Sequence, residues 1–210
     1  MSRTASARHA VLAACLCMLP VVGAFASGAE PGGGEAASVH AELGQVDRVQ
    51  RHFNRMKRIA DARLWRRKDY WATPSELVRA GGGDCEDLAA AKYFALRELG
   101  IPAERLRLVY ARVMDAAQGR IEAHVVLIYR TGHDAAWRVL DSLRDPLERL
   151  DERRDMLPWL SFNETGVSRF SSRGEERRLG GIDLLLPWQQ LLTRQRASDS
   201  VALVLSIHML

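Results

Sequence analysis

The stretch of sequence that most constrains the fold is "GGGDCEDLAAAKYFALRELGIP", residues 81–102. It contains the signals of both ends of a helix: Asp84 is a preferred N-cap, and Gly100 with Pro102 just beyond it is typical of a helix end. The residues between them predict a helix whose first turn contains Cys85. The chain must therefore place a thiol flanked by carboxylates at the tip of a helix.

Two helices are predicted before this one. Apolar residues recur at steps of three and four from Val39 to Ile59, which predicts a long amphipathic helix with basic residues on its solvated face. Thr73 as N-cap, Pro74 at the first helical position and Glu76 in a capping box predict a second, short helix. A run of three glycines ends this short helix.

Strand-like runs follow at residues 105–113, 123–130 and 136–141. The last two flank "TGHDA", which predicts a hairpin symmetric about its central Gly-His pair. In that register His124 lies directly opposite Asp141, and both side chains point to the same face of the sheet. A slip of one residue would put them on opposite faces.

The C-terminal part of the chain gives weaker signals. The stretch "LPWLSFNETG", residues 157–166, is loop-like, and Pro187 predicts the start of a short helix. The final "SVALVLSIHML" is apolar and too short to span a bilayer, so it is interpreted as a buried strand.

Cys85, His124 and Asp141 together predict nucleophilic catalysis by a thiol. The carboxylate would hold the imidazole by one ring N–H, which leaves the other ring nitrogen free for the thiol. Each residue alone also has an ordinary structural explanation. A cysteine at a helix start is more often inert, a His–Asp pair is as often structural, and Asp141 could simply end a strand. Spacing alone leaves both interpretations open.

The first residues have the pattern of an exported chain. Arg3 and Arg8 precede an apolar run, and the A-x-A sequence at 24–26 is a cleavage signal, so residues 1–26 are predicted to be a signal peptide. An uncleaved membrane anchor and lipoprotein processing at Cys15 are the alternatives.

Cleavage at that point sets the character of the mature chain. Residues 27–38 are expected to form a flexible Gly/Ala-rich leader, and residues 39–210 a single domain. The mature chain keeps 28 basic against 26 acidic residues, which gives no support for a nucleic-acid partner. No membrane span is expected after cleavage. Cys15 and Cys17 leave with the signal, so Cys85 is either buried filler or a reactive thiol.

Four stretches, "DYWATPSELVRAGGGDCEDLAAAKYFALRELGIP", "AHVVLIY", "VLDSL" and "RRDMLPWLSFNETG", resemble the bacterial transglutaminase-like cysteine proteinases, the LapG-type periplasmic proteases. The resemblance covers about residues 45–170. It implies an α+β fold similar to papain and transglutaminase, in which N-terminal helices carrying the cysteine pack on an antiparallel β-sheet carrying His and Asp. It also implies the triad Cys85, His124 and Asp141. Val125 and Ser142 depart from the expected Met and Asn.

Three acids surround the thiol: Asp84, Glu86 and Asp87. Their charge opposes thiolate formation, and a helix N-terminus offsets it by only about 0.3–1 kcal/mol. A Ca²⁺ ion bound by these carboxylates would neutralise them, and the resemblance implies calcium dependence. Calcium takes about 6–8 oxygens, so further ligands must come from elsewhere. Alternatively, Asp84 and Asp87 simply cap the helix.

The resemblance also implies a biological role. The substrate would be a large adhesin retained at the outer membrane and cut in its N-terminal region at an Ala-Ala site. The periplasmic domain of an inner-membrane cyclic-di-GMP receptor would sequester the protease. Two other functions remain open: a transglutaminase that passes the acyl group to an amine, and a non-catalytic binding module of the same fold.

Overall fold

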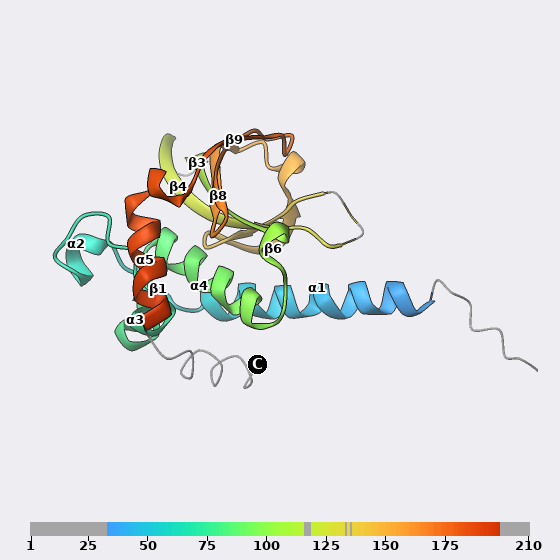
Figure 1. Cartoon of the computed structure of the whole chain (residues 1–210), viewed down its shortest axis with the longest axis horizontal. Coiled ribbons are helices and arrows are strands. Elements are labelled where there is room, and N and C mark those ends of the chain that lie inside the picture. Colours follow the sequence, from blue (N-terminus) through green and yellow to red (C-terminus); the bar gives the residue numbers. More distant parts are fainter. Residues whose placement is uncertain (1–32, 116–118, 133, 135, 198–210) are drawn as a thin grey trace, which may run out of the picture.

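The computed structural model describes residues 33–115, 119–132, 134 and 136–197, which form helices packed against one large antiparallel sheet (Figure 1). The predicted α+β architecture is confirmed. The predicted signal peptide and C-terminal strand lie outside the described residues. The helices are α1 (Gly33–Asn54), α2 (Asp61–Leu64), α3 (Pro74–Ala80), α4 (Cys85–Glu98) and α5 (Leu186–Ala197), with 3₁₀ turns η1 (Ala103–Arg105), η2 (Leu150–Glu152) and η3 (Ile182–Leu184).

The main sheet has seven strands in the order β6-β5-β4-β3-β7-β8-β9, all antiparallel to their neighbours. A separate parallel pair joins β1 to β2. The strands are β1 (Lys57–Arg58), β2 (Gly82–Gly83), β3 (Leu106–Asp115), β4 (Arg120–Tyr129), β5 (Arg138–Asp141), β6 (Arg144–Arg149), β7 (Met156–Asn163), β8 (Gly166–Phe170) and β9 (Glu176–Gly180).

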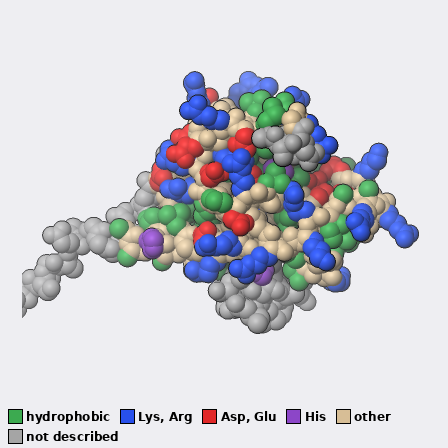
Figure 2. All heavy atoms as spheres, turned by 180° about the vertical axis from the view of Figure 1, so that it is seen from behind, with side chains coloured by type: hydrophobic (Ala, Val, Ile, Leu, Met, Phe, Trp, Pro, Cys, Tyr) green, Lys and Arg blue, Asp and Glu red, His purple; other side chains and the backbone are tan. Residues whose placement is uncertain are grey.

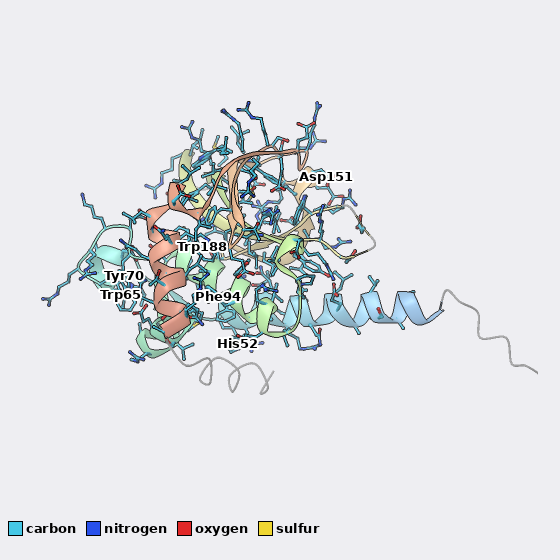
Figure 3. All side chains as sticks on the ribbon, in the orientation of Figure 1. His52, Trp65, Tyr70, Phe94, Asp151 and Trp188 are labelled. Atoms are coloured by element: carbon cyan, nitrogen blue, oxygen red, sulfur yellow. The ribbon has the colours of Figure 1, made fainter. Side chains whose placement is uncertain are left out.

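The core lies between the helices and one face of the sheet. On β4, Val125, Leu127 and Tyr129 face the helices, while Val126 and Ile128 point to a second apolar cluster on the other face. This is the period-two alternation expected of a strand covered on both sides. Trp188 of α5 stacks on Phe94 of α4 with ring centroids 5.7 Å apart, and so closes the core near the C-terminal half of α4 (Figure 3).

The caps predicted around the cysteine helix are confirmed. Thr73 and Glu76 form the capping box of α3, which ends at Gly81 in the left-handed conformation with φ 72°. Asp84 is the N-cap of α4, and Gly100, with φ 89°, follows its C-terminus. These signals are local in sequence, because each involves a residue within four positions of the helix end that it satisfies.

The first helix differs from its predicted range. It begins at Gly33, so residues 33–38 of the expected leader are helical, and it ends at Asn54 although the apolar periodicity continues to Ile59. The chain leaves the helix because Lys57 and Arg58 pair in parallel with β2 and the Ile59 N–H donates to the Gly83 carbonyl at 2.9 Å. In Figure 1 the N-terminal turns of α1 extend beyond the rest of the fold.

The loop predicted at residues 157–166 is wrong. Most of it is β7, which pairs with β3 on one side and with β8 on the other. Pro158 lies beside a bulge, where a missing N–H is tolerated. The true turn is confined to the end of the stretch, where Asn163 Oδ1 accepts the Thr165 N–H at 2.9 Å. The helix predicted at Pro187 is confirmed as α5.

Candidate active site

Cys85 is the first residue of α4, and its thiol is free. Cys85 packs against the core cluster that contains Val125 of β4, the residue that follows His124, and the backbone N–H of Val125 lowers the pKa of the thiol. The thiol itself donates to Glu86 Oε2 at 2.8 Å. Cys85 therefore stands where α4 meets β4, with a carboxylate as its present partner.

His124 and Asp141 are in direct contact. His124 Nε2 lies 2.8 Å from Asp141 Oδ1, and both side chains are buried. Asp141 Oδ1 also accepts the Leu143 N–H at 2.9 Å, and its Oδ2 accepts from Arg153 Nη2 at 2.9 Å. Because the carboxylate is ionised, Nε2 of the imidazole carries the proton and Nδ1 is left as the basic nitrogen.

Burial by itself raises the pKa of Asp141, but its partners more than compensate. The hydrogen bond and charge of His124, the Leu143 N–H and the charge of Arg153 together hold the pKa of Asp141 well below its usual range. Asp141 thus stays charged over the working pH range and can stabilise an imidazolium beside it.

The predicted register of the hairpin is wrong by two residues, although the contact it was used to predict is present. The observed pairs are Leu127 with Leu140 and Tyr129 with Arg138. Continuing that ladder puts Asp141 opposite Val126, one step diagonal to His124. A shift of two residues preserves the face because side chains alternate with period two, whereas a shift of one would not.

A network missed from the sequence supports Asp141 from α1. Gln50 Nε2 donates to the Asp141 carbonyl at 2.8 Å and to the Arg144 carbonyl at 2.6 Å. Asn54 Nδ2 reaches the same Asp141 carbonyl at 3.0 Å, and the buried Lys92 Nζ donates to Asn54 Oδ1 at 2.7 Å. The sequence signal for this network is the spacing of Gln50 and Asn54, whose amide side chains lie four residues apart on one face of a predicted helix.

A group of three carboxylates lies beside the thiol: Asp61, Asp84 and Glu86, each with one oxygen within 4.8 Å of the others. Two of these were expected from the sequence. Asp61, buried at the start of α2, is a new member that no local motif indicated. Asp87, the third expected acid, is outside this group, and its Oδ1 accepts the Ala72 N–H at 2.6 Å.

These carboxylates suit a hard cation. Burial and then the charges of Glu86, Asp87 and Asp61 raise the pKa of Asp84. Burial raises the pKa of Asp87 to about 7. Asp61 Oδ1 and Asp87 Oδ2 are buried and have no hydrogen-bond partner among the described residues. Crowded, partly unpartnered oxygens are a donor set that Ca²⁺ prefers, so the residues present fit this ion.

The same charges act on the nucleophile. Burial, the Glu86 charge and the hydrogen bond to Glu86 raise the pKa of the Cys85 thiol well above its usual value. The Val125 N–H lowers it, but by less. With the acids uncompensated, the thiol is held in its protonated and unreactive form.

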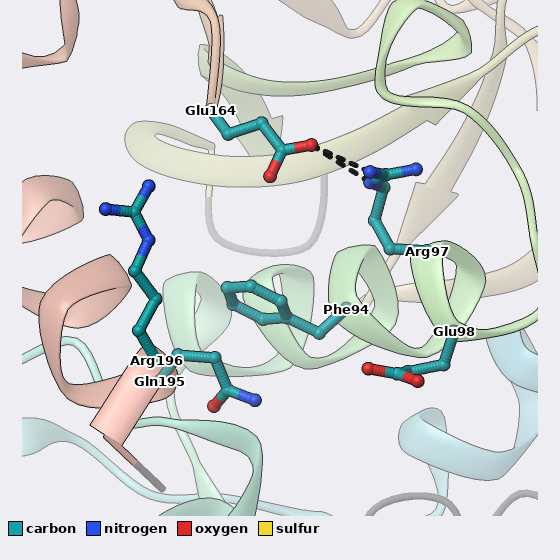
Figure 4. A pocket seen from close by; sticks show the side chains of 6 residues that line it. All are labelled: Phe94, Arg97, Glu98, Glu164, Gln195 and Arg196. Atoms are coloured by element: carbon teal, nitrogen blue, oxygen red, sulfur yellow. Dashed lines mark hydrogen bonds and ion pairs between the residues drawn. The ribbon is translucent and has the colours of Figure 1, made fainter.

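A separate pocket of about 340 Å³ is not part of this site. It is lined by Phe94, Arg97, Glu98, Glu164, Gln195 and Arg196 at the C-terminal end of α4 (Figure 4). Its main charges neutralise each other, since Arg97 lies 2.9 Å from Glu164. Cys85 is at the opposite end of the same helix.

The described residues on the face of the molecule seen in Figure 2 form no large patch of one charge sign. Basic and acidic side chains are interspersed over the face seen in Figure 2. Within the described ranges, no helix combines the length and apolar character that crossing a bilayer requires.

Residues 29–154 match the family described as bacterial transglutaminase-like cysteine proteinase. The chain is also similar to solved structures of Legionella pneumophila LapG. The EGTA-treated form is 32% identical, with a TM-score of 0.61 over 73% of this chain and 78% of that one. The calcium-bound form is 32% identical, with a TM-score of 0.59 over 72% and 79%. No curated protein matches at significant similarity.

Proposed function

The chain belongs to the bacterial transglutaminase-like cysteine proteinases and is a cysteine protease, and from this premise we propose that it is a calcium-dependent periplasmic endopeptidase acting on a large surface adhesin. The observation that carries the catalytic part is the 2.8 Å contact of Asp141 with His124, one residue before Val125, which belongs to the core cluster that Cys85 packs against.

The reaction is amide hydrolysis in two steps. His124 Nδ1 takes the proton from Cys85, and the sulfur attacks the peptide carbonyl carbon. The imidazolium returns the proton to the leaving amine, so a thioester remains on the enzyme. His124 then takes a proton from water, which attacks the thioester carbonyl carbon; the C–S bond breaks, the acid product leaves, and the imidazolium returns its proton to the Cys85 sulfur. The Cys85 N–H, at the start of α4, is a donor for the oxyanion.

Calcium dependence is supported by the carboxylate group and by the calcium-bound form of the similar LapG structure. Asp84 and Glu86 would hold the ion together with Asp61, whereas Asp87 lies outside this group of carboxylates. When bound, the ion supplies positive charge next to the nucleophile. With Glu86 engaged as a ligand, its carboxylate would no longer accept from the thiol, and the pKa of Cys85 would fall.

The substrate and the location are supported by the family relationship and the exported pattern of residues 1–26. We expect cleavage in the N-terminal region of an outer-membrane-retained adhesin at an Ala-Ala site, which would release the cell from a surface. We also expect sequestration by the periplasmic domain of a cyclic-di-GMP receptor.

The test is incubation of the mature protein with calcium and N-terminal adhesin fragments, with Cys85→Ala as the inactive control. Mass spectrometry should find two hydrolysed fragments that need both Cys85 and calcium. Product carrying an added amine in place of water would instead indicate transglutaminase activity. Uncleaved fragments bound equally by both proteins would indicate a binding module.

A further inference from the structure

A second pocket, of about 270 Å³, lies on the sheet and is lined by four side chains: Arg112 of β3, Leu157 and Trp159 of β7, and Arg169 of β8. Its floor is apolar and open to solvent, since Leu157 is 61% exposed and Trp159 is 38% exposed. Large apolar side chains that remain exposed to solvent between two arginines indicate a binding surface.

The pocket is on the face of the sheet that carries the helices and the thiol. Leu108 and Tyr110 of β3 pack into the helix-side core, and alternation puts Arg112 on that same face. Arg169 pairs with Leu160, which also packs against this core. The pocket therefore shares its face with Cys85.

Tyr110 connects the pocket to the nucleophile. Its ring stacks on Trp159 with centroids 5.8 Å apart and planes 20° apart. Tyr110 and Cys85 both pack against the helix-side core, so the ring and the thiol border the same apolar cluster. A peptide bound over Tyr110 would reach both the thiol and the pocket.

A bulge turns Trp159 outward at this point. Tyr110 pairs with Leu160 and the next residue of β3 pairs with Pro158, which leaves Trp159 as the extra residue. Bulges of this kind re-aim a side chain and are frequent beside active sites. The exposed indole is therefore held by the ladder on both sides of it.

The two arginines have no partner of opposite charge. Among the residues that the structure describes, neither Arg112 nor Arg169 makes a side-chain hydrogen bond or ion pair, whereas Arg107 of the same strand as Arg112 is paired with Glu176 at 2.9 Å. Two free guanidinium groups beside an apolar floor are complementary to a carboxylate next to an apolar side chain.

We propose that this pocket is a substrate subsite that binds an apolar residue with an adjacent Asp or Glu in the peptide to be cleaved. The assignment of the occupant as substrate rests on the proposed protease function. Leu157 and Trp159 would cover the apolar side chain, and Arg112 and Arg169 would pair with the carboxylate.

Binding to the inactive Cys85→Ala protein tests the subsite without catalysis. The probes are fluorescent synthetic peptides with a Leu-Glu pair in an Ala/Gly background, and the same peptides with Leu-Gln. We expect about tenfold tighter binding of the Leu-Glu peptides, as charge-assisted bonds to two arginines allow. In Arg112→Glu/Arg169→Glu the preference should pass to Leu-Lys peptides, while Arg48→Glu, an exposed position on α1, should keep the original order.

Equal affinity for Leu-Glu and Leu-Gln peptides, unchanged by the double charge reversal, would overturn the subsite. Arg112→Gln/Arg169→Gln gives the same comparison if the reversed variant fails to fold. With the active protein, the ratio of kcat/KM for the two peptide series should follow the binding ratio. Cleavage with an unchanged ratio refutes the subsite alone, whereas selective binding without any cleavage refutes the protease function alone. Arginine-dependent binding of a partner protein with no effect on peptides would overturn the assignment to substrate.

Discussion

The thiol of Cys85 donates its hydrogen bond to the carboxylate of its own neighbour, Glu86, across 2.8 Å. The imidazole that should activate it is meanwhile held by Asp141 on the next strand. The base is therefore already oriented, while the nucleophile is held back by an acid. Activation then depends on what removes Glu86 from the sulfur.

Replacing Glu86 should partly release the thiol. In Glu86→Gln the charge that raises the pKa of Cys85 is gone, so alkylation by iodoacetamide in EGTA should be about tenfold faster than in the unaltered protein. Glu98→Gln, at the exposed end of the same helix, is the control. Labelling in Glu86→Gln as slow as in the parent protein would contradict this account of the raised pKa.

Asp61 should be a ligand for the cation even though it lies far from the cysteine motif in sequence. Asp61→Asn removes one of three clustered carboxylates, and we expect calcium affinity to fall at least tenfold in calorimetric titration. Asp183→Asn, an exposed position in η3, should bind as the parent does. Unchanged affinity in Asp61→Asn would exclude this residue from the site.

Asp141 should be needed for both catalysis and stability. In Asp141→Asn the amide N–H can donate to Nε2 of His124, which then no longer has to carry the ring proton. Nδ1 is then no longer held as the basic nitrogen, so kcat should fall by about 10³–10⁴-fold. The buried Arg153 also loses a charged partner, which should lower the free energy of unfolding by about 3 kcal/mol. Urea unfolding of both proteins separates the two effects. Asp151→Asn, on the surface, should change neither quantity.

Lys92 should make stability rise with pH. Burial lowers its pKa from 10.5 to about 7 in the folded protein, while the charges of Asp141 and Asp145 oppose this. Between these two values the unfolded chain binds a proton that the folded chain does not, so the free energy of unfolding should increase with pH, by at most about 1.4 kcal/mol per pH unit. Below pH 7 this gain is absent.

Urea unfolding of Lys92→Met from pH 6 to 10 measures that contribution. The difference in stability between Lys92→Met and the parent should change steadily in favour of the parent above pH 7. Lys57→Met, at an exposed position, should show a constant difference. A constant difference for Lys92→Met as well would mean that the amine stays charged in the fold.

The helix ends around the cysteine could be predicted because the responsible contacts are local. Thr73 bonds to the N–H three residues ahead, and Gly81 supplies a left-handed end. β7 was not predicted because the pairing with β3 that makes it a strand involves residues about 50 positions earlier in the chain. The contact of His124 with Asp141 was predicted correctly from a wrong register, because an error of two residues leaves both side chains on the same face of the sheet.

Asp61, Gln50 and Asn54 could not have been found in the same way. Each joins the site through a contact across many residues, and none lies in a motif that predicts its partner. Sequence periodicity assigned the two amides to a helix face, but could not show that this face would be placed against Asp141.

The ladder between β1 and β2 holds the segment that contains Asp61 beside the start of the cysteine helix. It consists of only two residue pairs. A cation shared by Asp61 and Asp84 would act as a staple across it, joining a segment before α3 to one after it. Melting temperature should then rise with calcium concentration, and proteolytic nicking between residues 57 and 70 should slow in parallel. A bound calcium ion would in this way stabilise the arrangement of the two segments as well as increase the reactivity of the thiol.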